Sequence, residues 1–386
     1  MNDGESQPMR LVLISRRYPP QIGGAERVMA NMAEALARSG HLVTVVSSQN
    51  FTEGIAATSD TEPADQHNNP KLIRLPYNGL RMIGTAQYMW GLDRWLNRHR
   101  PDLVYVSMLK HDAYVAVRAG QKLGFPVVLR PEGAGLTGDL AWQKRGRFGA
   151  VIGRKTRQAN GLVVLSETIQ RELLTDGYDP NRIHLIANGV PVPIEHWSND
   201  KANVTKQVVF VGRLAQEKGL DTLLDAWPEV LKSYPEKQLR LIGDGPMRAA
   251  LEQQAKHLGI ANSVEFAGAL SDAAKQIRQA SLFVLPSREE GLSIALLEAM
   301  AMGLPVVASD IPGNRILVKP GVTGRLALPD QPLMLSEMIV QAFANQAMTM
   351  EMAQAGRALV QASYSIEAVA QKHLELFRRM IDETPR

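Results

Sequence analysis

Short apolar runs alternate with longer amphipathic stretches along most of the chain. Apolar runs such as 9–15 and 282–285 are typical of strands that are buried on both faces of a parallel sheet. Amphipathic stretches such as 366–381 are predicted to be helices that cover such a sheet. The alternation of buried strands with helices predicts an α/β protein with parallel sheets.

The predicted strands fall into two sets that are separated by a turn-rich segment. The strands are expected at 9–15, 41–47, 71–75, 103–107, 126–130, 161–165 and 183–187, and then at 207–211, 238–242, 264–267, 282–285 and 305–308. Segment 188–204 has several prolines and no periodicity, so we predict a hinge there. The chain has 386 residues, which is too long for one ordinary core. We therefore predict an N-terminal domain over 1–187 and a C-terminal domain over 205–363.

Composition narrows the classes of protein without choosing among all of them. The chain has no cysteine, which excludes a disulfide framework and a thiol nucleophile and fits a reducing cytosol. No apolar stretch approaches the roughly 20 residues that span a bilayer, and the first apolar run is too short for the core of a signal peptide. We therefore expect a cytoplasmic protein that is soluble or peripheral on the inner face of the membrane.

The net charge of +4 favours anionic partners. Nucleotide-sugar phosphates and an anionic lipid surface both satisfy this preference. The sequence has no paired CxxC and no aromatic RNA-binding strand, so we expect no nucleic-acid partner.

One segment, 282–307, carries the strongest chemical signal, and it reads LFVLPSREEGLSIALLEAMAMGLPVV. It predicts a strand, a polar loop, a helix from about Ser293 to Met302 and a further strand. Glu290 lies in the loop at the carboxyl end of the first strand, where open α/β sheets bind ligands, and Glu298 lies in the second helical turn.

The backbone between these two glutamates adds a different kind of ligand group. The N–H groups of Gly291, Leu292 and Ser293 are expected at the N-terminus of the helix, where an anion such as phosphate is favoured. The loop can therefore offer carboxylates to hydroxyl groups and amides to phosphate. A nucleotide sugar presents both.

The loop after the first predicted strand contains two adjacent glycines. Gly23 and Gly24 allow the backbone to approach a ligand closely where the next helix starts, so phosphate could be met by amide groups. A tight turn is the alternative interpretation of this pair.

The segment SREEGLSIALLEAMAMGLPVVASDIPGN, with seven residues between its glutamates, resembles the donor-binding signature of the retaining family-4 glycosyltransferases. The resemblance covers nearly the whole chain and is strongest over 210–324. It implies the GT-B fold, in which two Rossmann-like domains face a cleft. It also implies that the C-terminal helix, about 364–386, packs back on the N-terminal domain.

The resemblance assigns roles to further residues of the C-terminal domain. Gly212, Arg213 and Lys218 belong to the pattern GRLAQEKG, which in the family supplies the cations that hold the donor diphosphate. Fixed cations stabilise a leaving nucleoside diphosphate, because it gains charge in the transition state. Gly243, in the turn GDGP, resembles the loop on the base or phosphate side of the donor.

These roles predict a retaining hexosyltransferase of class EC 2.4 that transfers a sugar from a nucleotide-diphosphate sugar. The acceptor implied is a glycan or a lipid-linked intermediate of cell-surface polysaccharide or glycolipid synthesis. No Asp-x-Asp motif is present and the histidines lack ligand spacing, so we predict no cofactor and no catalytic metal. The catalytic residues are expected to be Arg213, Lys218 and Glu290.

Two positions depart from the family pattern. Many relatives have a histidine near the end of the strand 126–130, where this chain has Glu132 followed by Gly133. Glu132 and Asp139 are therefore the candidates for contact with the acceptor. Relatives also commonly place an acid where this chain has Ile316.

The segment 141–159 is unusually basic and is interleaved with aromatic and aliphatic residues. A basic amphipathic helix can lie on an anionic membrane surface. A helix docked on the domain with a solvated basic face explains the same pattern, so both interpretations stay open.

Two other functions are compatible with parts of the sequence. An NAD-dependent oxidoreductase would also use Rossmann-like domains, but the first strand is not followed by GxGxxG. A catalytically inactive GT-B scaffold that binds a membrane or a partner protein would explain Glu132, Ile316 and the basic segment. The intact Arg213 and Glu290 count against it.

Overall fold

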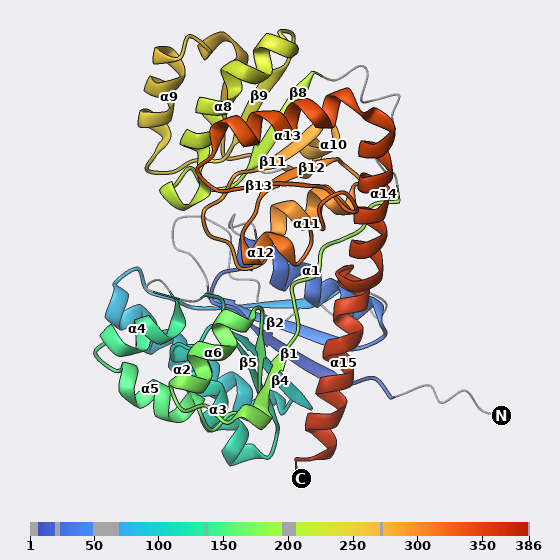
Figure 1. Ribbon diagram of the computed structural model, residues 1–386. Coiled ribbons are helices and arrows are strands. Elements are labelled where there is room, and N and C mark those ends of the chain that lie inside the picture. Colours follow the sequence, from blue (N-terminus) through green and yellow to red (C-terminus); the bar gives the residue numbers. More distant parts are fainter. Residues whose placement is uncertain are drawn as a thin grey trace, which may run out of the picture. The chain divides into compact units, whose positions relative to one another are not determined.

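The computed structural model describes residues 7–19, 24–48, 69–133, 135, 138–194, 206–270 and 273–384. Its contacts divide the chain into two compact units (Figure 1). Unit 1 comprises Met1–Gly189 and Val369–Arg386, and unit 2 comprises Val190–Ala368. The predicted hinge, 188–204, lies outside the described residues from 195 onward.

Unit 1 is built on a seven-stranded sheet whose neighbouring strands all pair in parallel. The strand order is β3-β2-β1-β4-β5-β6-β7. The strands are β1 (Arg10–Ile14), β2 (Leu42–Ser48), β3 (Lys71–Leu75), β4 (Leu103–Ser107), β5 (Val127–Arg130), β6 (Gly161–Val164) and β7 (Ile183–Leu185). This order, reversing at β1 and β4, is that of a doubly wound sheet.

The helices of unit 1 connect these strands. They are α1 (Gly24–Arg38), α2 (Arg81–His99), α3 (His111–Leu123), α4 (Asp139–Arg145), α5 (Gly149–Thr156), α6 (Glu167–Thr175) and the 3₁₀ turn η2 (Pro180–Arg182). Strands β4, β5 and β6 are buried along their whole length, as expected for strands covered on both faces. Tyr88 and Trp95 of α2 belong to this core, whereas Trp90 on the same helix is exposed.

Unit 2 repeats the design with a six-stranded parallel sheet in the order β10-β9-β8-β11-β12-β13. The strands are β8 (Gln207–Val211), β9 (Gln238–Ile242), β10 (Val264–Gly268), β11 (Leu282–Leu285), β12 (Val306–Ser309) and β13 (Arg325–Ala327). The helices and 3₁₀ turns are η3 (Gln216–Lys218), α8 (Leu220–Ser233), α9 (Arg248–His257), η4 (Ala261–Ser263), α10 (Ala273–Arg278), α11 (Ile294–Ala301), α12 (Pro312–Arg315), α13 (Pro332–Ala344) and α14 (Gln346–Ser363). The predicted α/β class with parallel sheets is confirmed.

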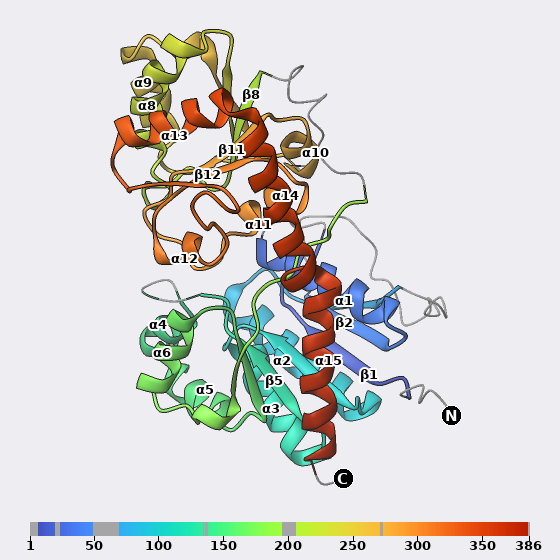
Figure 2. The ribbon, with the colours of Figure 1, turned by 45° about the vertical axis from the view of Figure 1, so that its right-hand side comes forward.

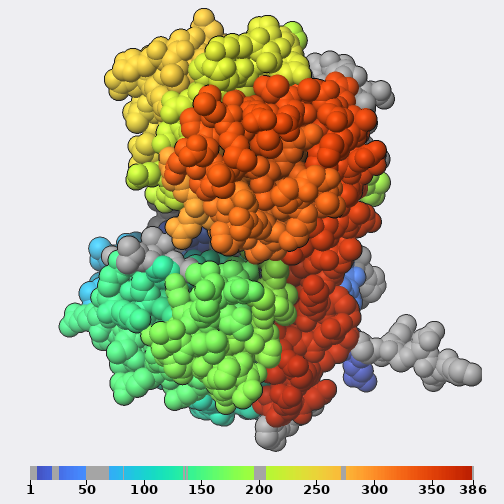
Figure 3. All heavy atoms as spheres, viewed as in Figure 1, coloured from blue at the N-terminus to red at the C-terminus, as the bar shows by residue number. Residues whose placement is uncertain are grey.

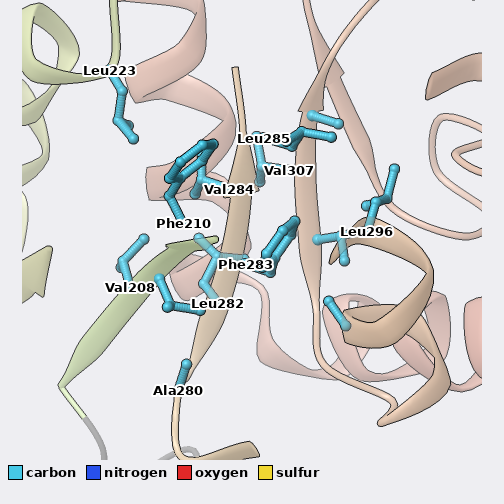
Figure 4. Close-up of a cluster of buried hydrophobic side chains, with 14 of the residues drawn as sticks. Val208, Phe210, Leu223, Ala280, Leu282, Phe283, Val284, Leu285, Leu296 and Val307 are labelled. Atoms are coloured by element: carbon cyan, nitrogen blue, oxygen red, sulfur yellow. The ribbon is translucent and has the colours of Figure 1, made fainter. Parts of the chain in front are cut away.

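The core of unit 2 surrounds β11, the strand that leads into the loop with Glu290. Phe283 and Leu285 are buried beside Phe210 of β8 and Val307 of β12, and Leu296 of α11 closes the cluster (Figure 4). A fully buried side chain of this kind stabilises the fold by roughly 1.5–3 kcal/mol. This packing holds the end of β11 in a fixed position.

The last helix, α15 (Ile366–Asp382), belongs to unit 1 from Val369 onward and lies along the sheet of that unit (Figure 2). Its His373 is buried, and Nε2 of that ring lies 3.1 Å from the hydroxyl of Tyr105 on β4. The ring Nδ1 lies 2.8 Å from the carbonyl of Val369, so Nδ1 donates to that carbonyl and the Tyr105 hydroxyl donates to Nε2. Burial lowers the pKa of this ring to about 4, which favours the neutral imidazole, and the ring joins α15 to the centre of the sheet.

The interpretation of one segment as a single helix needs correction. The basic segment 141–159 is two short helices, α4 and α5, because the chain turns sharply between Gly146 and Gly149. A Cβ atom on Gly149 would lie only 1.7 Å from the carbonyl oxygen of Gln143, so this turn requires glycine. Among the described residues, no helix has the length and apolarity to cross a membrane.

Candidate functional site

The carboxyl ends of β8 and β9 meet through two glycines. Gly243 has φ +139°, and a Cβ atom there would lie 1.8 Å from the carbonyl oxygen of Gly212. The N–H of Gly212 donates to Ile242, and the N–H of Gly243 donates to Gly268, at 2.9 and 2.8 Å. The loops predicted to face the donor are therefore brought side by side, with bare backbone at their point of contact.

Arg213 and Lys218 lie in the connection that follows β8. Arg213 comes two residues after the end of the strand and is exposed, whereas Lys218 ends the turn η3. The next residue, Gly219, has φ +62° and packs on the carbonyl of Pro286, which a Cβ atom would meet at 2.2 Å. This contact places the η3 turn against the end of β11.

Glu290 receives two polar side chains at one carboxylate oxygen. The ammonium of Lys218 donates to Oε1 at 2.7 Å, and the hydroxyl of Ser287 donates to the same oxygen at 2.8 Å. The side chains of Lys218 and Glu290 are 21% and 9% exposed, so the pair is largely shielded from water but still reachable. The structure thus joins two residues that the sequence had assigned to one site.

A buried chain of hydrogen bonds from Asn314 through Ser309 fixes the backbone of Ser287. The hydroxyl of Ser309 donates to the carbonyl of Ser287, and Nδ2 of Asn314 donates to the carbonyl and hydroxyl of Ser309 at 2.9 and 3.1 Å. Gly313, beside Asn314, approaches so closely that a Cβ atom there would lie 2.2 Å from the carbonyl oxygen of Glu290. Helix α12 therefore packs directly against the backbone of the Glu290 loop.

Helix α11 begins at Ile294, with Ser293 as its N-cap rather than its first helical residue. The Ser293 hydroxyl accepts a hydrogen bond from the N–H of Leu296 at 3.4 Å. The N–H groups of Gly291, Leu292 and Ser293 therefore precede the helix, and those of its first turn have no partner inside it. Glu298 lies in the second turn, as predicted, and is 9% exposed.

Arg288, which the sequence analysis does not indicate as a site residue, makes several polar contacts beside the Glu290 loop. Its guanidinium forms a two-point ion pair with Asp221 of α8 at 2.7 and 2.9 Å, and Nε lies 2.7 Å from Oδ1 of Asp330. Nη1 also donates to the carbonyl of Gln216 at 2.6 Å. Both partners are distant in the sequence, so no local pattern could indicate the contact.

The acceptor candidates lie in a second polar network, in unit 1. Oε1 of Glu132 receives the hydroxyl of Ser107 at 2.6 Å and also pairs with the guanidinium of Arg130. Both oxygens of Asp139 accept backbone N–H groups, from Leu109 at 3.2 Å and from Glu132 at 2.8 Å. The two predicted carboxylates are thus adjacent, and Asp139 fixes the backbone that carries Glu132.

The pKa of each of the two carboxyl groups in this network is raised above its ordinary value. Burial raises the pKa of Glu132, and the opposing charge of Arg130 and hydrogen bond of Ser107 offset only part of this effect. Burial also raises the pKa of Asp139, against the two backbone hydrogen bonds that it accepts. Arg130 itself is buried, and its second guanidinium nitrogen donates to Asn188.

The first glycine of the predicted phosphate loop, Gly23, lies outside the described residues. Gly24 is the first residue of α1. Within the described ranges, His, Asp and Glu side chains form no group of three that could hold a metal ion.

Helices α4 and α5 expose a basic and partly apolar surface, which we call the α4–α5 face. In Figure 3, α4 and α5 belong to the blue-green to green part of unit 1, which also includes later residues such as those of α6. Phe148 is 53% and Val151 45% exposed. The exposed cations of this face are Lys144, Arg145, Arg147 and Arg154.

Two families of known proteins match the chain. Residues 192–359 match the family described as glycosyl transferases group 1. Residues 23–189 match the family described as glycosyl transferase 4-like domain. The two matches adjoin and together span most of the chain.

Individual relatives match over nearly their whole length. A glycogen synthase of Mycobacterium tuberculosis is 28% identical, over 94% of this chain and 92% of the relative. A GDP-mannose-dependent monoacylated alpha-(1-6)-phosphatidylinositol monomannoside mannosyltransferase of Corynebacterium glutamicum is 25% identical, over 95% and 97%. Among solved structures, Anabaena Alr3699/HepE in complex with UDP and glucose superimposes with a TM-score of 0.73 at 20% identity, over 96% of this chain and 99% of that chain.

These similarities agree with the two doubly wound sheets and with the residues gathered at the end of β11. The predicted family and fold are confirmed: the chain belongs to the glycosyl transferases group 1, is a glycosyltransferase and has the GT-B fold.

Proposed function

We propose that this glycosyltransferase transfers a sugar from a nucleotide-diphosphate sugar to an acceptor with retention of the anomeric configuration. The observation that carries the proposal is the pairing of Lys218 with Glu290 at the carboxyl end of β11, beside the bare backbone of Gly212 and Gly243. A cation next to amide groups suits a diphosphate, and a carboxylate suits sugar hydroxyl groups. The Anabaena structure, which contains UDP and glucose, supports this class of donor.

In this proposal Arg213 and Lys218 bind the diphosphate of the donor and stabilise it as it leaves. Arg213 is exposed and comes directly after Gly212, so its side chain can reach a ligand above that loop. These cations stabilise the negative charge that develops on the leaving diphosphate. Because their backbone is already fixed, little reorganisation is needed during the reaction. No catalytic metal or other cofactor is needed for this step.

Glu290 and the amides of Gly291, Leu292 and Ser293 hold the transferred sugar, and Glu298 holds the ribose hydroxyl groups. Glu290 has one oxygen engaged by Lys218 and Ser287, so its other oxygen can accept a sugar hydroxyl. Glu298 is fixed within a helix whose core face is completely packed.

We propose a glycan or a lipid-linked intermediate of cell-surface polysaccharide or glycolipid synthesis as the acceptor. The two named relatives illustrate both classes, since one makes glycogen and the other acts on a phosphatidylinositol mannoside. Glu132 is the favoured contact in unit 1, because both oxygens of Asp139 are already engaged by backbone amides.

A lipid-linked acceptor would require contact with the inner face of the membrane, and the α4–α5 face suits such a surface. Phe148 and Val151 can enter the interface while Arg147 and Arg154 remain at the phosphate groups. The protein would then be cytoplasmic and peripheral.

The competing function is a catalytically inactive scaffold of the same fold. Ile316, which is 42% exposed where relatives commonly have an acid, favours it. An inactive scaffold gains nothing from a shielded ion pair at the donor site, which favours the enzyme.

The decisive experiment is thermal unfolding of the purified protein with UDP-, GDP- and ADP-sugars in the absence of metal. A ligand at 100 times its dissociation constant should add roughly 2.7 kcal/mol of stability. We expect one nucleotide class to stabilise the protein and Arg213→Ala to abolish the effect. Stabilisation without slow hydrolysis of the sugar would favour the scaffold, and no stabilisation by any of these donors would contradict the proposed function.

A further inference from the structure

Arg288 lies at the junction of three segments of unit 2. It belongs to the loop between β11 and α11, two residues before Glu290. Its guanidinium contacts Asp221 in the first turn of α8 and Asp330 just before α13. These two partners lie 67 and 42 positions from Arg288 in the sequence, so this side chain joins three segments that are distant along the chain.

The contacts of Arg288 enclose the turn that carries Lys218. Its side chain donates to the carbonyl of Gln216, and its backbone N–H donates to the carbonyl of Glu217 at 2.8 Å. These are the two residues that directly precede Lys218 in η3. On the other side of Lys218, the ion pair with Asp221 fixes the start of α8.

Asp330, the second carboxylate partner of Arg288, has an uncommon backbone conformation. It adopts a left-handed backbone conformation with φ +57°, which residues other than glycine rarely occupy. Its Oδ1 accepts hydrogen bonds from Arg288 and, at 3.3 Å, from the hydroxyl of Thr222. This aspartate is therefore held in place by Arg288 and Thr222, which also lie next to the Lys218 turn.

The charges around Arg288 agree with a permanent ion pair. Desolvation alone would raise the pKa of Asp221, but the hydrogen bonds and positive charge of Arg288 outweigh it, so the pKa lies below its ordinary value. The guanidinium fork matches the carboxylate at two points, a geometry that lysine cannot reproduce.

We infer that Arg288 is a positioning residue that sets the distance between Lys218 and Glu290. It does not reach that pair itself. It fixes the backbone on both sides of Lys218 and belongs to the loop that ends in Glu290, so a change at Arg288 moves both catalytic candidates. This role rests on the proposed function of the Lys218–Glu290 pair.

The test compares Arg288→Met and Arg288→Lys with Arg240→Met. Arg240 is a matched control, because it pairs with Glu265 at 3.2 Å and bonds Gln276 within the same unit, away from the Glu290 loop. The turnover of the nucleotide sugar that stabilises the wild type is measured well below the melting temperature of each variant. We expect kcat to fall by about 10- to 100-fold in both Arg288 variants, since a small misplacement of catalytic groups has effects of that order. Arg240→Met should stay within about twofold of the wild type, as expected for a change distant from the site.

Hydrogen exchange of the two segments gives a readout that does not depend on activity. Amides in 214–222 and 286–293 should exchange at least about tenfold faster in Arg288→Met than in the wild type, because their shared anchor is lost. Arg240→Met should leave both segments unchanged. Wild-type exchange in both segments of Arg288→Met, or a kcat no lower than that of Arg240→Met, would overturn the inference. Failure of the wild type to use any donor would instead count against the proposed function, and exchange alone would then decide whether Arg288 positions the pair.

Discussion

The ammonium of Lys218 lies 2.7 Å from Oε1 of Glu290, although the two residues are 72 positions apart in the chain. One belongs to the turn after β8 and the other to the loop after β11, and these strands are neighbours in the sheet of unit 2. Each of the two residues neutralises the charge of the other. The pair therefore keeps a cation and a carboxylate ready at the position where we propose that the diphosphate and the sugar meet.

Replacing Lys218 with Ala should lower turnover by roughly 100-fold or more, because a charge that stabilises the transition state is lost. Folding stability should fall by roughly 1–3 kcal/mol, because the shielded carboxylate of Glu290 loses its cation but keeps the hydrogen bond from Ser287. Steady-state kinetics and thermal unfolding measure the two effects. Lys232→Ala is the matched control, because Lys232 pairs with the exposed Glu229 at 2.6 Å on the surface of α8. Equal turnover in the two variants would contradict the role of Lys218.

Gly313→Ala should weaken donor binding strongly, although it adds only one methyl group. The added methyl group would lie 2.2 Å from the carbonyl oxygen of Glu290 and 2.5 Å from that of Gly291, so the backbone of the loop must move. We expect weaker donor binding together with a loss of roughly 1–3 kcal/mol of stability, the usual cost of overpacking. Gly79→Ala is the control, since a Cβ atom there meets nothing within 4 Å. Binding titrations that show equal donor affinity in both variants would contradict the prediction.

The sequence predicted the elements of the fold and the Lys218–Glu290 region because these depend on local patterns. Apolar runs determine strands, and a loop at the carboxyl end of a strand faces ligands whatever surrounds it. The role of Arg288 was not predicted, although this residue lies two positions before Glu290. Its role depends on contacts with Asp221 and Asp330, which are distant in the sequence. Nothing in a local window distinguishes a residue with such partners from a solvated one.

Two further features of the structure also depend on contacts that a local sequence pattern does not reveal. Segment 141–159 has the composition of one basic helix, and only the close approach of Gly149 to Gln143 shows that it must break. His373 occupies a position that the helical period marks as part of the apolar face of α15. The period indicates that it is buried, but it gives no sign of the Tyr105 hydroxyl that accompanies it.

Stability should decrease with falling pH through His373. Burial lowers the pKa of this ring to about 4, and the charge of Arg130 acts in the same direction against the hydrogen bond to Val369. The unfolded chain, with an ordinary pKa near 6.5, binds the proton first. The contribution of His373 to the free energy of unfolding is therefore fully present above about pH 6.5. It is lost progressively between pH 6.5 and 4, by roughly 3 kcal/mol in total.

His373→Gln should remove this part of the pH dependence, because the amide oxygen can still accept from Tyr105 but does not titrate in this range. Denaturant unfolding at a series of pH values measures the slope. His257→Gln, on the exposed side of α9, is the control and should keep the wild-type slope. A variant of His373 with an unchanged slope would show that other groups cause the acid sensitivity.

Binding to anionic vesicles should depend on the apolar part of the α4–α5 face as well as on its charge. Phe148 and Val151 together should contribute roughly 2 kcal/mol if about half of each side chain enters the interface. The double variant Phe148→Ser with Val151→Ser should then bind phosphatidylglycerol vesicles roughly 30-fold more weakly in co-sedimentation. Leu42→Ser, which removes a comparably exposed leucine elsewhere on unit 1, should bind like the wild type. If the wild type sediments equally with neutral phosphatidylcholine vesicles, or if both variants bind equally, the face is a solvated basic surface and the lipid-linked acceptor loses its structural support.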